Sequence, residues 1–274
     1  MVSGSSDCTV RVWELVSAPS PEDTGDGGAA HVIRAEVKQV LEDHSAGVLD
    51  LRMNERWIVS CSKDTLIHVY SRDTLELVHV LRGHEGPVNA IAGLDSEVDS
   101  SGRLVSHVVS ASGDGKMILW DVESGERIRV FEGHDRGLAC IEFKNDLILS
   151  GSNDCTIKLW RASTGECLHT FAGHTMLVRA LCFDPHTGYI VSASYDRTVR
   201  VWEWREGENA YARERGWPTG DGESRTSTSS ATSTRTTASR RSKTQGAGRL
   251  IREFRNLHAS HIFDVKFDVG KIVR

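Results

Sequence analysis

The residues best suited to chemistry in this chain are a histidine, a serine and an aspartate, of which His134, Ser150 and Asp154 are one set. A serine activated by a histidine that an aspartate orients is the arrangement of acyl-transfer enzymes. The same types, each set followed by a tryptophan, recur in register: His84, Ser110, Asp114 and Trp120; His134, Ser150, Asp154 and Trp160; His174, Ser192, Asp196 and Trp202. Because a catalytic set occurs once per site whereas a framework repeats, we expect a structural role and no enzyme.

The elements that must position this framework are short strands. We expect the aspartate to accept backbone N–H bonds in a tight turn, and the histidine to fix a loop and pass its ring N–H to that aspartate. The serine should lie in the adjacent strand with the tryptophan packed over it. A further copy begins at His44 and contains the turn aspartate Asp64, and in it Tyr70 replaces the tryptophan.

The framework belongs to a phrase that occurs five times. The copies read GSSDCTVRVW (4–13), CSKDTLIHVY (61–70), ASGDGKMILW (111–120), GSNDCTIKLW (151–160) and ASYDRTVRVW (193–202). Each fuller unit, such as 133–171, predicts four strands with turns between them. A repeat near forty residues with this signature predicts an all-β protein, a β-propeller with four whole repeats and two partial ones. Because the first and last repeats are cut, we expect either a fragment of a larger protein or a truncated gene model.

Three segments interrupt the repeat: 15–34, rich in Pro, Gly, Asp and Ala; 94–103, acidic and Ser-rich; and 205–248, rich in Ser, Thr, Gly and Arg. We expect the first to be a flexible insertion, the second a loop between two strands and the third a disordered insertion, because such compositions bury little apolar surface.

Composition narrows the class of protein. A net charge of −5 points to neither nucleic acid nor membrane as a partner, and no apolar run or leader suggests insertion or secretion. The six scattered cysteines predict reduced thiols, hence a cytoplasmic or nuclear protein. No phosphate loop, zinc spacing or paired-carboxylate motif is present, so we expect no cofactor and no metal.

Function in a repeat protein is expected where equivalent positions differ. One variable position precedes the turn aspartate: Ser6, Lys63, Gly113, Asn153 and Tyr195. The other lies five residues after the histidine: Leu49, Asn89, Ala139, Arg179 and Phe263. Arg136, Gly137 and His261 lie nearby in the sequence. Cations converging from separate repeats suit a phosphate or carboxylate, and the N–H beside Arg136 adds a donor, so the sequence favours a phosphorylated or acidic peptide.

Outside its insertions the chain resembles the WD-repeat family. Segments such as HSAGVLDLRMN, VSCSKD, GHDRGLACIEF, LILSGSND and GHTMLVRALCFD look more narrowly like the β-transducin repeat-containing F-box proteins, which are substrate receptors of SCF ubiquitin ligases. This resemblance implies an incomplete seven-blade ring whose narrow face captures doubly phosphorylated peptides. The chain would reach the ligase core only through an F-box that it lacks.

The same resemblance implies roles for individual residues. Ser6 corresponds to a phosphoserine contact, Arg136 and Gly137 to the grip on a second phosphate, and Lys63, Arg179 and Tyr195 to contacts with the peptide's aspartate and backbone. Leu49, Asn89 and Ala139 would line the mouth of the channel. His261 stands where the family has an arginine, and Asn153 where a serine is usual. Two alternatives stay open: a WD-repeat scaffold of another assembly with no phosphate requirement, and a related F-box receptor, such as a sulfur-metabolism regulator, that would share the ligase role but not the peptide. A hydrolase fails because the framework repeats, and only turnover that one Ser→Ala change abolishes would revive it.

Overall fold

A computed structural model describes residues 1–19, 31–98, 102, 104–205, 247–255 and 258–266 of the chain. All secondary structure in these residues is β, arranged in five antiparallel sheets, which confirms the predicted fold class. None of the described segments forms a helix of the length and hydropathy that crossing a bilayer requires.

The first sheet has three strands and each of the other four has four. The first contains β1 (Val2–Gly4), β2 (Val10–Pro19) and β3 (His31–Leu41). The second contains β4 (Val48–Met53), β5 (Trp57–Ser62), β6 (Ile67–Ser71) and β7 (Leu77–Leu81), and the third β8 (Val88–Val98), β9 (Leu104–Ser112), β10 (Met117–Asp121) and β11 (Arg127–Phe131). The fourth contains β12 (Leu138–Lys144), β13 (Leu147–Ser152), β14 (Thr156–Arg161) and β15 (Cys167–Ala172), and the fifth β16 (Val178–Asp184), β17 (Tyr189–Ser194), β18 (Val199–Arg205) and β19 (Ala247–Phe254).

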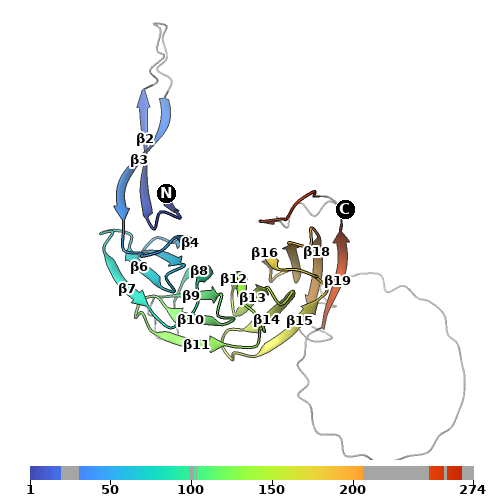
Figure 1. The fold of residues 1–274 in the computed structure, drawn as a ribbon. Coiled ribbons are helices and arrows are strands. Elements are labelled where there is room, and N and C mark those ends of the chain that lie inside the picture. The colour runs from blue at the N-terminus through green and yellow to red at the C-terminus, as the bar shows by residue number, and fades with distance from the viewer. Residues whose placement is uncertain (20–30, 99–101, 103, 206–246, 256–257, 267–274) are drawn as a thin grey trace, which may run out of the picture.

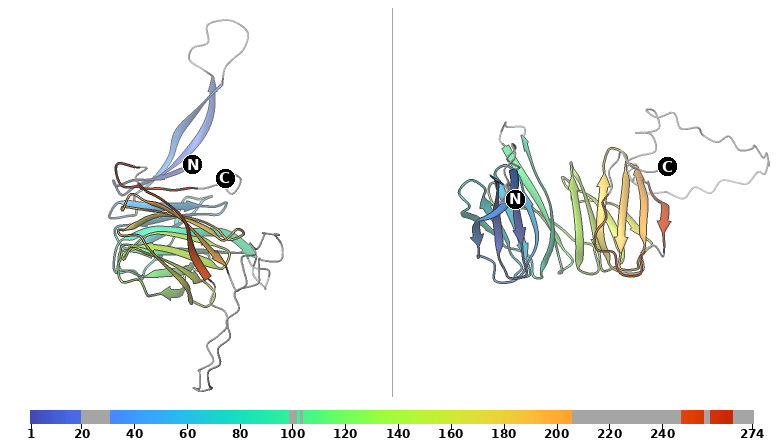
Figure 2. Two further views of the ribbon diagram at one scale, coloured as in Figure 1. Left: turned by 90° about the vertical axis from the view of Figure 1, so that its right-hand side faces the viewer. Right: turned by 90° about the horizontal axis from the view of Figure 1, so that it is seen from above.

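The sheets stand side by side in an arc, as the blades of a propeller do, and the arc is open between the first and fifth sheets (Figures 1 and 2). The first strands β4, β8, β12 and β16 contact one another in sequence, so they form the inner side of the arc. β1 contacts β4 in the same way that β5 contacts β8 and β13 contacts β16. β1 therefore occupies the place of a second strand, as the repeat predicts.

The hydrophobic core lies between the sheets. Alternation places apolar side chains on both faces of each sheet, where they meet the neighbouring sheets. The tryptophan of each whole repeat faces the preceding sheet: Trp120 packs with Val59 and Val69, and Trp160 with Ala111 and Leu119. One cluster of this kind spans each contact between neighbouring sheets, so the stability of every sheet depends on its neighbour.

The 15–34 insertion differs from the predicted loop at both of its described ends. Residues 15–19 and 31–34 extend β2 and β3 as a paired antiparallel ribbon, with Leu15 opposite Ala35 and Ser17 opposite Ile33. The ribbon projects beyond the sheets (Figures 1 and 2). It forms because VRVWELVS and HVIRAEVKQV are both rich in β-branched residues, a strand signal that the composition of the segment as a whole obscures. Residues 20–30 lie outside the described residues.

The other two insertions also begin or end in strands. Residues 94–98 belong to β8, which is irregular between Gly93 and Ser96 and then pairs with β9 again, so this part of the predicted loop continues the strand. Residues 99–101 and 103 lie outside the described residues. Arg205 ends β18 and Ala247 begins β19, as expected for an insertion between a third and a fourth strand. Residues 206–246 lie outside the described residues.

The last partial repeat forms no strand within 258–266. Its contribution is the side chain of Ile262, which is buried against Ala180 and Ala193 of the fifth sheet. Residues 271–274, with the sequence KIVR, lie outside the described residues.

Candidate functional site

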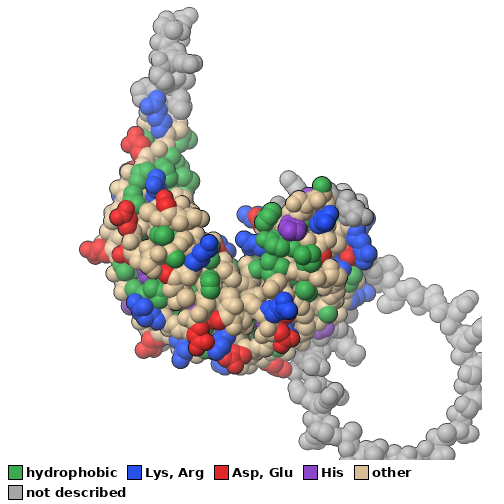
Figure 3. All heavy atoms as spheres, in the orientation of Figure 1, with side chains coloured by type: hydrophobic (Ala, Val, Ile, Leu, Met, Phe, Trp, Pro, Cys, Tyr) green, Lys and Arg blue, Asp and Glu red, His purple; other side chains and the backbone are tan. Residues whose placement is uncertain are grey.

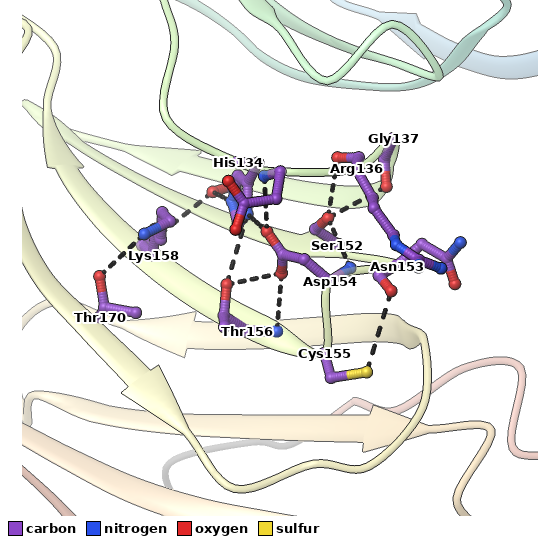
Figure 4. A network of polar contacts seen from close by, with 12 residues as sticks. His134, Arg136, Gly137, Ser152, Asn153, Asp154, Cys155, Thr156, Lys158 and Thr170 are labelled. Carbon is purple, nitrogen blue, oxygen red and sulfur yellow. Dashed lines mark hydrogen bonds and ion pairs between the residues drawn. The ribbon is translucent and has the colours of Figure 1, made fainter.

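A chain of hydrogen bonds connects the framework residues of each repeat that carries the tryptophan, and Figure 4 shows its His134–Asp154 link in the fourth sheet. In the fourth sheet Trp160 Nε1 donates to Ser150 Oγ at 2.9 Å, Ser150 Oγ lies 2.8 Å from His134 Nε2, and His134 Nδ1 lies 2.7 Å from Asp154 Oδ2. Because a carboxylate only accepts, Nδ1–H is the donor to Asp154 and Nε2 accepts from the serine. The same chain joins His84, Ser110, Asp114 and Trp120, and His174, Ser192, Asp196 and Trp202.

This arrangement resembles a catalytic triad in its bonds but not in its exposure. Ser110, Ser150 and Ser192 are each 0% exposed, so no substrate carbonyl reaches their hydroxyls. Burial lowers the pKa of His84, His134 and His174, in opposition to their aspartate partners, which keeps the rings neutral. The framework is therefore structural.

The His44 copy completes its framework differently. His44 Nε2 lies 2.8 Å from Ser60 Oγ and Nδ1 lies 2.8 Å from Asp64 Oδ2. His68 stacks on His44 with ring centroids 3.8 Å apart, and Tyr70 Oη lies 3.2 Å from His68 Nδ1. Burial is the main reason that the pKa of His68 falls to about 4. Ser60 and His68 were not predicted as framework residues, although Ser60 holds the same place in its repeat as Ser150.

A second buried serine fixes each turn, and sequence reasoning missed it. Ser152 Oγ donates to the carbonyl oxygens of Arg136 and Gly137 and accepts from the N–H of Asp154 (Figure 4). The serines in the equivalent place are Ser62, Ser112 and Ser194. The signal was available, because a serine stands two residues before the aspartate in every copy of the phrase.

The position before each turn aspartate is held against the histidine loop of its own sheet. The N–H of Lys63 donates to Gly47 O, that of Gly113 to Pro87 O, and that of Tyr195 to Leu177 O, at distances of 2.8–3.0 Å. Asn153 and Gly137 make the same bond at 3.0 Å. We call the surface formed by these turns and histidine loops the turn face.

The second variable position coincides with a β-bulge in every four-stranded sheet. The pairing of β4 with β5 shifts between Val48 and Asp50, which leaves Leu49 unpaired. Asn89, Ala139 and Arg179 are the unpaired residues of β8, β12 and β16. A bulge redirects a side chain and recurs next to binding sites. The sequence located these positions by spacing alone, without the bulge that sets the direction of their side chains.

Asn89 and Arg179, both predicted site residues, also bond to the inner strand of a neighbouring sheet. Asn89 Nδ2 donates to Leu138 O at 2.7 Å, and Arg179 Nη1 donates to Ala139 O at 3.3 Å. Asp50 Oδ2 accepts the N–H of Ile91 at 3.1 Å in the same manner. Inner strands have no further strand to pair with, so side chains satisfy their free backbone groups.

Two cations on the turn face have no partner within the described residues. The side chains of Lys63 and Arg136 are exposed, and neither forms a hydrogen bond or ion pair there. Arg136 extends beside Asn153 in Figure 4. The turn aspartates do not neutralise them, because their carboxylates are only 4–8% exposed and are engaged by histidine and backbone donors. Exposed Glu85 and Asp135 follow His84 and His134 directly, so the turn face carries both positive and negative charges.

Gly137 provides an anion donor beside Arg136. Its carbonyl accepts from Asn153 and Ser152, while its N–H has no acceptor within the described residues. A side chain is excluded here, because a Cβ on Gly137 would lie 2.7 Å from the carbonyl oxygen of Gly113 in the preceding sheet. Ser6 is placed likewise against Gly47 of the following sheet.

An aromatic cluster occupies the last part of the turn face. Tyr195 stacks on His261 with ring centroids 4.5 Å apart, and the Phe263 ring meets Tyr195 edge-on at 5.6 Å. Tyr195 belongs to the first variable position and Phe263 to the second, and His261 lies near Phe263 in the sequence. The structure brings the three side chains into one cluster. Figure 3 shows hydrophobic side chains gathered on the side of the opening that the fifth sheet forms.

No cluster of three or more His, Cys, Asp or Glu side chains in the described part of the chain is arranged to hold a metal ion. The six cysteines form no disulfide. The chemistry of the turn face is therefore that of charge, hydrogen bonding and aromatic contact.

A family model decides the classification. The model described as "WD domain, G-beta repeat" matches residues 1–14, 35–71, 75–121, 125–161 and 165–203, more than half of the chain. The chain belongs to the WD-repeat family.

Curated WD-repeat relatives match parts of the chain. The human F-box-like/WD repeat-containing protein TBL1X is 30% identical over 151 residues, covering 53% of this chain and 24% of the relative. E3 ubiquitin-protein ligase COP1 of Arabidopsis thaliana is 28% identical over 138 residues, covering 49% and 16%. Human pre-mRNA-processing factor 17 is 37% identical over 140 residues, covering 49% and 20%. The chain thus spans about a quarter or less of the length of these WD-repeat proteins.

Proposed function

We propose that the turn face binds a phosphorylated or acidic peptide segment of a protein partner. The observation that carries this proposal is the pairing of the unpartnered Arg136 guanidinium with the free N–H of Gly137. A planar fork of donors next to a backbone N–H is suited to phosphate or carboxylate oxygens.

The other variable residues supply the rest of such a site. Lys63 offers a second unpaired cation, its ammonium group. One nitrogen of Arg179 donates to Ala139 O, which orients the guanidinium. Ser6, Asn89 and Asn153 can hydrogen-bond a peptide backbone, while Leu49, Ala139 and Tyr195 contribute apolar surface. His261 lies on the Tyr195 ring, where an imidazole binds an anion best when protonated.

We further propose that the propeller selects substrates for an SCF-type ubiquitin ligase, in the cytoplasm or nucleus. The resemblance to the β-transducin repeat-containing F-box proteins supports this, as do the names of two relatives, one an E3 ubiquitin-protein ligase and the other an F-box-like protein. The link to the ligase core would require an F-box elsewhere in the full protein. A WD-repeat scaffold in another assembly is the alternative, consistent with the pre-mRNA-processing factor among the relatives.

A peptide array tests the binding class directly. Doubly phosphorylated Asp-Ser-Gly peptides, their unphosphorylated forms and glutamate-substituted forms are probed with the full chain. We expect retention of the phosphorylated and glutamate forms and loss on Lys63→Ala, while Arg34→Ala on the projecting ribbon leaves binding unchanged. Equal retention of all three forms would favour the scaffold alternative. Co-purification of the full-length protein with ligase core subunits then tests the receptor role separately.

A further inference from the structure

A cavity of about 530 Å³ opens between the third and fourth sheets, at the end of the sheets opposite the turn face. Its apolar wall contains Leu119, Ile128 and Phe143, and its polar lining includes Asp95, Arg129 and Asp146. The volume lies in the range of small-ligand pockets. No residue of the predicted peptide site lines it.

The equivalent space between the second and third sheets is filled by an indole. Trp57 begins β5, the strand that corresponds to β9 of the third sheet, and its Nε1 donates to Glu123 Oε1 at 2.8 Å. The Arg56 guanidinium lies over the Trp57 ring, 5.4 Å from its centroid, and Arg56 also bonds to Glu123. One arginine, one carboxylate and one indole therefore form a compact unit at this contact.

The equivalent space between the fourth and fifth sheets also holds an indole. Trp204 is 6% exposed and packs with Leu147, which begins β13. The N–H of Trp204 bonds to Gly188 O, as the N–H of Ala162 bonds to Asp146 O and that of Val122 to Ser106 O. Trp204, Ala162 and Val122 are therefore equivalent positions.

At the cavity the equivalent residues are all too small to fill the space. His107 stands in the place of Trp57 and Leu147, Ala162 in the place of Trp204, and Ser163 in the place of Glu123. All three line the cavity. Because protein interiors are normally close-packed, an interface that lacks the indole of both its neighbours is incomplete without an occupant.

The polar groups at the cavity match those around Trp57. Arg129 donates from its two terminal nitrogens to Ser163 O and Thr164 O, which holds the guanidinium across the interface, and its Nε has no partner. Asp95 and Asp146 offer carboxylates, and Asp146 already accepts from the N–H and hydroxyl of Ser163. The carboxylates of Asp95 and Asp146 can accept a ligand N–H, and the Arg129 guanidinium can lie against an aromatic ring. Together they suit an aromatic ligand that donates a single N–H.

We propose that this cavity binds the indole of a tryptophan presented by a partner protein. The ring would lie against Leu119, Ile128 and Phe143 as Trp57 lies in its own interface, with the indole N–H donating to a carboxylate of Asp95 or Asp146. Tryptophan is one of the residue types enriched among the hot spots that anchor protein interfaces in buried pockets. This site is separate from the turn face and serves a different class of ligand.

Calorimetric titration of the full chain with N-acetyl-L-tryptophanamide and with free indole tests the proposal. We expect both to bind and N-acetyl-L-leucinamide not to. Ala162→Trp places an indole in the cavity at the position equivalent to Trp204 and should weaken binding by about tenfold or more. Ala172→Trp, on the exposed end of β15, should leave the affinity unchanged. Binding of free indole alone would overturn the assignment to a tryptophan of a protein.

A second variant covers the case in which Ala162→Trp does not fold. The double substitution His107→Trp with Ser163→Glu rebuilds the Trp57–Glu123 pair at the cavity. It should raise the thermal midpoint and abolish binding of the amide. A rebuilt interface that still binds the amide with wild-type affinity would contradict the proposal, as would a wild-type chain that binds neither probe. Arg136→Ala should not change the affinity, which separates this site from the turn face.

Discussion

The backbone N–H of Asn153 donates to the carbonyl oxygen of Gly137 at 3.0 Å, and this bond joins the turn of the fourth sheet to its histidine loop. Asn153 belongs to one variable position, and Gly137 directly follows Arg136. Since the same bond recurs in the second, third and fifth sheets, the variable side chains are carried by a backbone that the repeat makes rigid. A binding site built on such a support loses little conformational entropy when it closes on a ligand.

The buried serine of the framework is the point where its stability is most easily tested. Ser150→Ala leaves His134 Nε2 and Trp160 Nε1 without a partner in the core. Each unpaired buried group costs about 1–3 kcal/mol, so we expect a loss of that order or more in the free energy of unfolding. Urea denaturation measures it, with exposed Ser45→Ala as the matched control. A variant as stable as the control would contradict the assigned network.

The turns predict a pair of opposite substitutions. The residue after each turn aspartate has a positive φ, 72° for Thr65 and 86° for Gly115. A β-branched side chain is strained in this region and glycine is not. Thr65→Gly should therefore raise the free energy of unfolding by about 1 kcal/mol, and Gly115→Thr should lower it by about 1–2 kcal/mol. Equal signs for the two changes, read from denaturation midpoints, would refute the argument.

Acid should destabilise the propeller in two stages. Burial holds the pKa of His84, His134 and His174 below the usual 6.5 in the folded protein, so the unfolded chain binds protons first as pH falls. Their contribution is complete above about pH 6.5 and is lost below it.

The second stage comes from the turn aspartates. Burial opposes the shift, but hydrogen bonds from Thr198 and His174 outweigh it and lower the pKa of Asp196 to about 2. The corresponding stability is present above pH 3.8, the ordinary value, and is lost as pH falls toward about 2. Urea midpoints measured at steps from pH 8 downward should decline from about 6.5, and again below about 4. A midpoint that rises on acidification would have the wrong sign.

The aromatic cluster should determine the order of the segment 258–266. Within 258–266, Ile262 reaches the core of the fifth sheet, and the stacked pair of Tyr195 and His261 lies next to it. Tyr195→Ala should increase amide hydrogen exchange across 259–266 by about tenfold, equivalent to about 1.4 kcal/mol of local stability. Exchange in β12 and β13, two strands of the preceding sheet, serves as the internal control. Unchanged exchange in both regions would mean that Ile262 alone secures the segment.

The repeat made the framework predictable, because the phrase states which residues must meet. His134, Ser150, Asp154 and Trp160 are joined as expected, and the four-stranded sheets follow from the alternation in 133–171. Leu49 and Arg179 were located as variable positions, but the bulge at each depends on pairing with the next strand, which spacing within one strand does not reveal.

Features that depend on contacts between sheets were beyond sequence reasoning. The projecting ribbon was obscured by the Pro and Gly content of 15–34, although its strands are rich in β-branched residues. The hydrogen bond from Asn89 to Leu138 O joins neighbouring sheets, and the cavity at Ala162 lies between two sheets. Comparison of equivalent positions, Trp57 with His107 and Trp204 with Ala162, would have indicated the missing indole once the register of the sheets was known.

The central claim, that the turn face binds phosphate groups through Arg136 and Gly137, is tested most directly by a double cycle of affinities. The full chain and Arg136→Ala are each titrated with one peptide in its phosphorylated and unphosphorylated forms. Charge-assisted bonds of this kind contribute about 1.5–3 kcal/mol, so Arg136→Ala should weaken the phosphorylated peptide by about tenfold or more and leave the unphosphorylated one nearly unchanged. Equal effects of the substitution on both peptides, or no effect on either, would contradict the account.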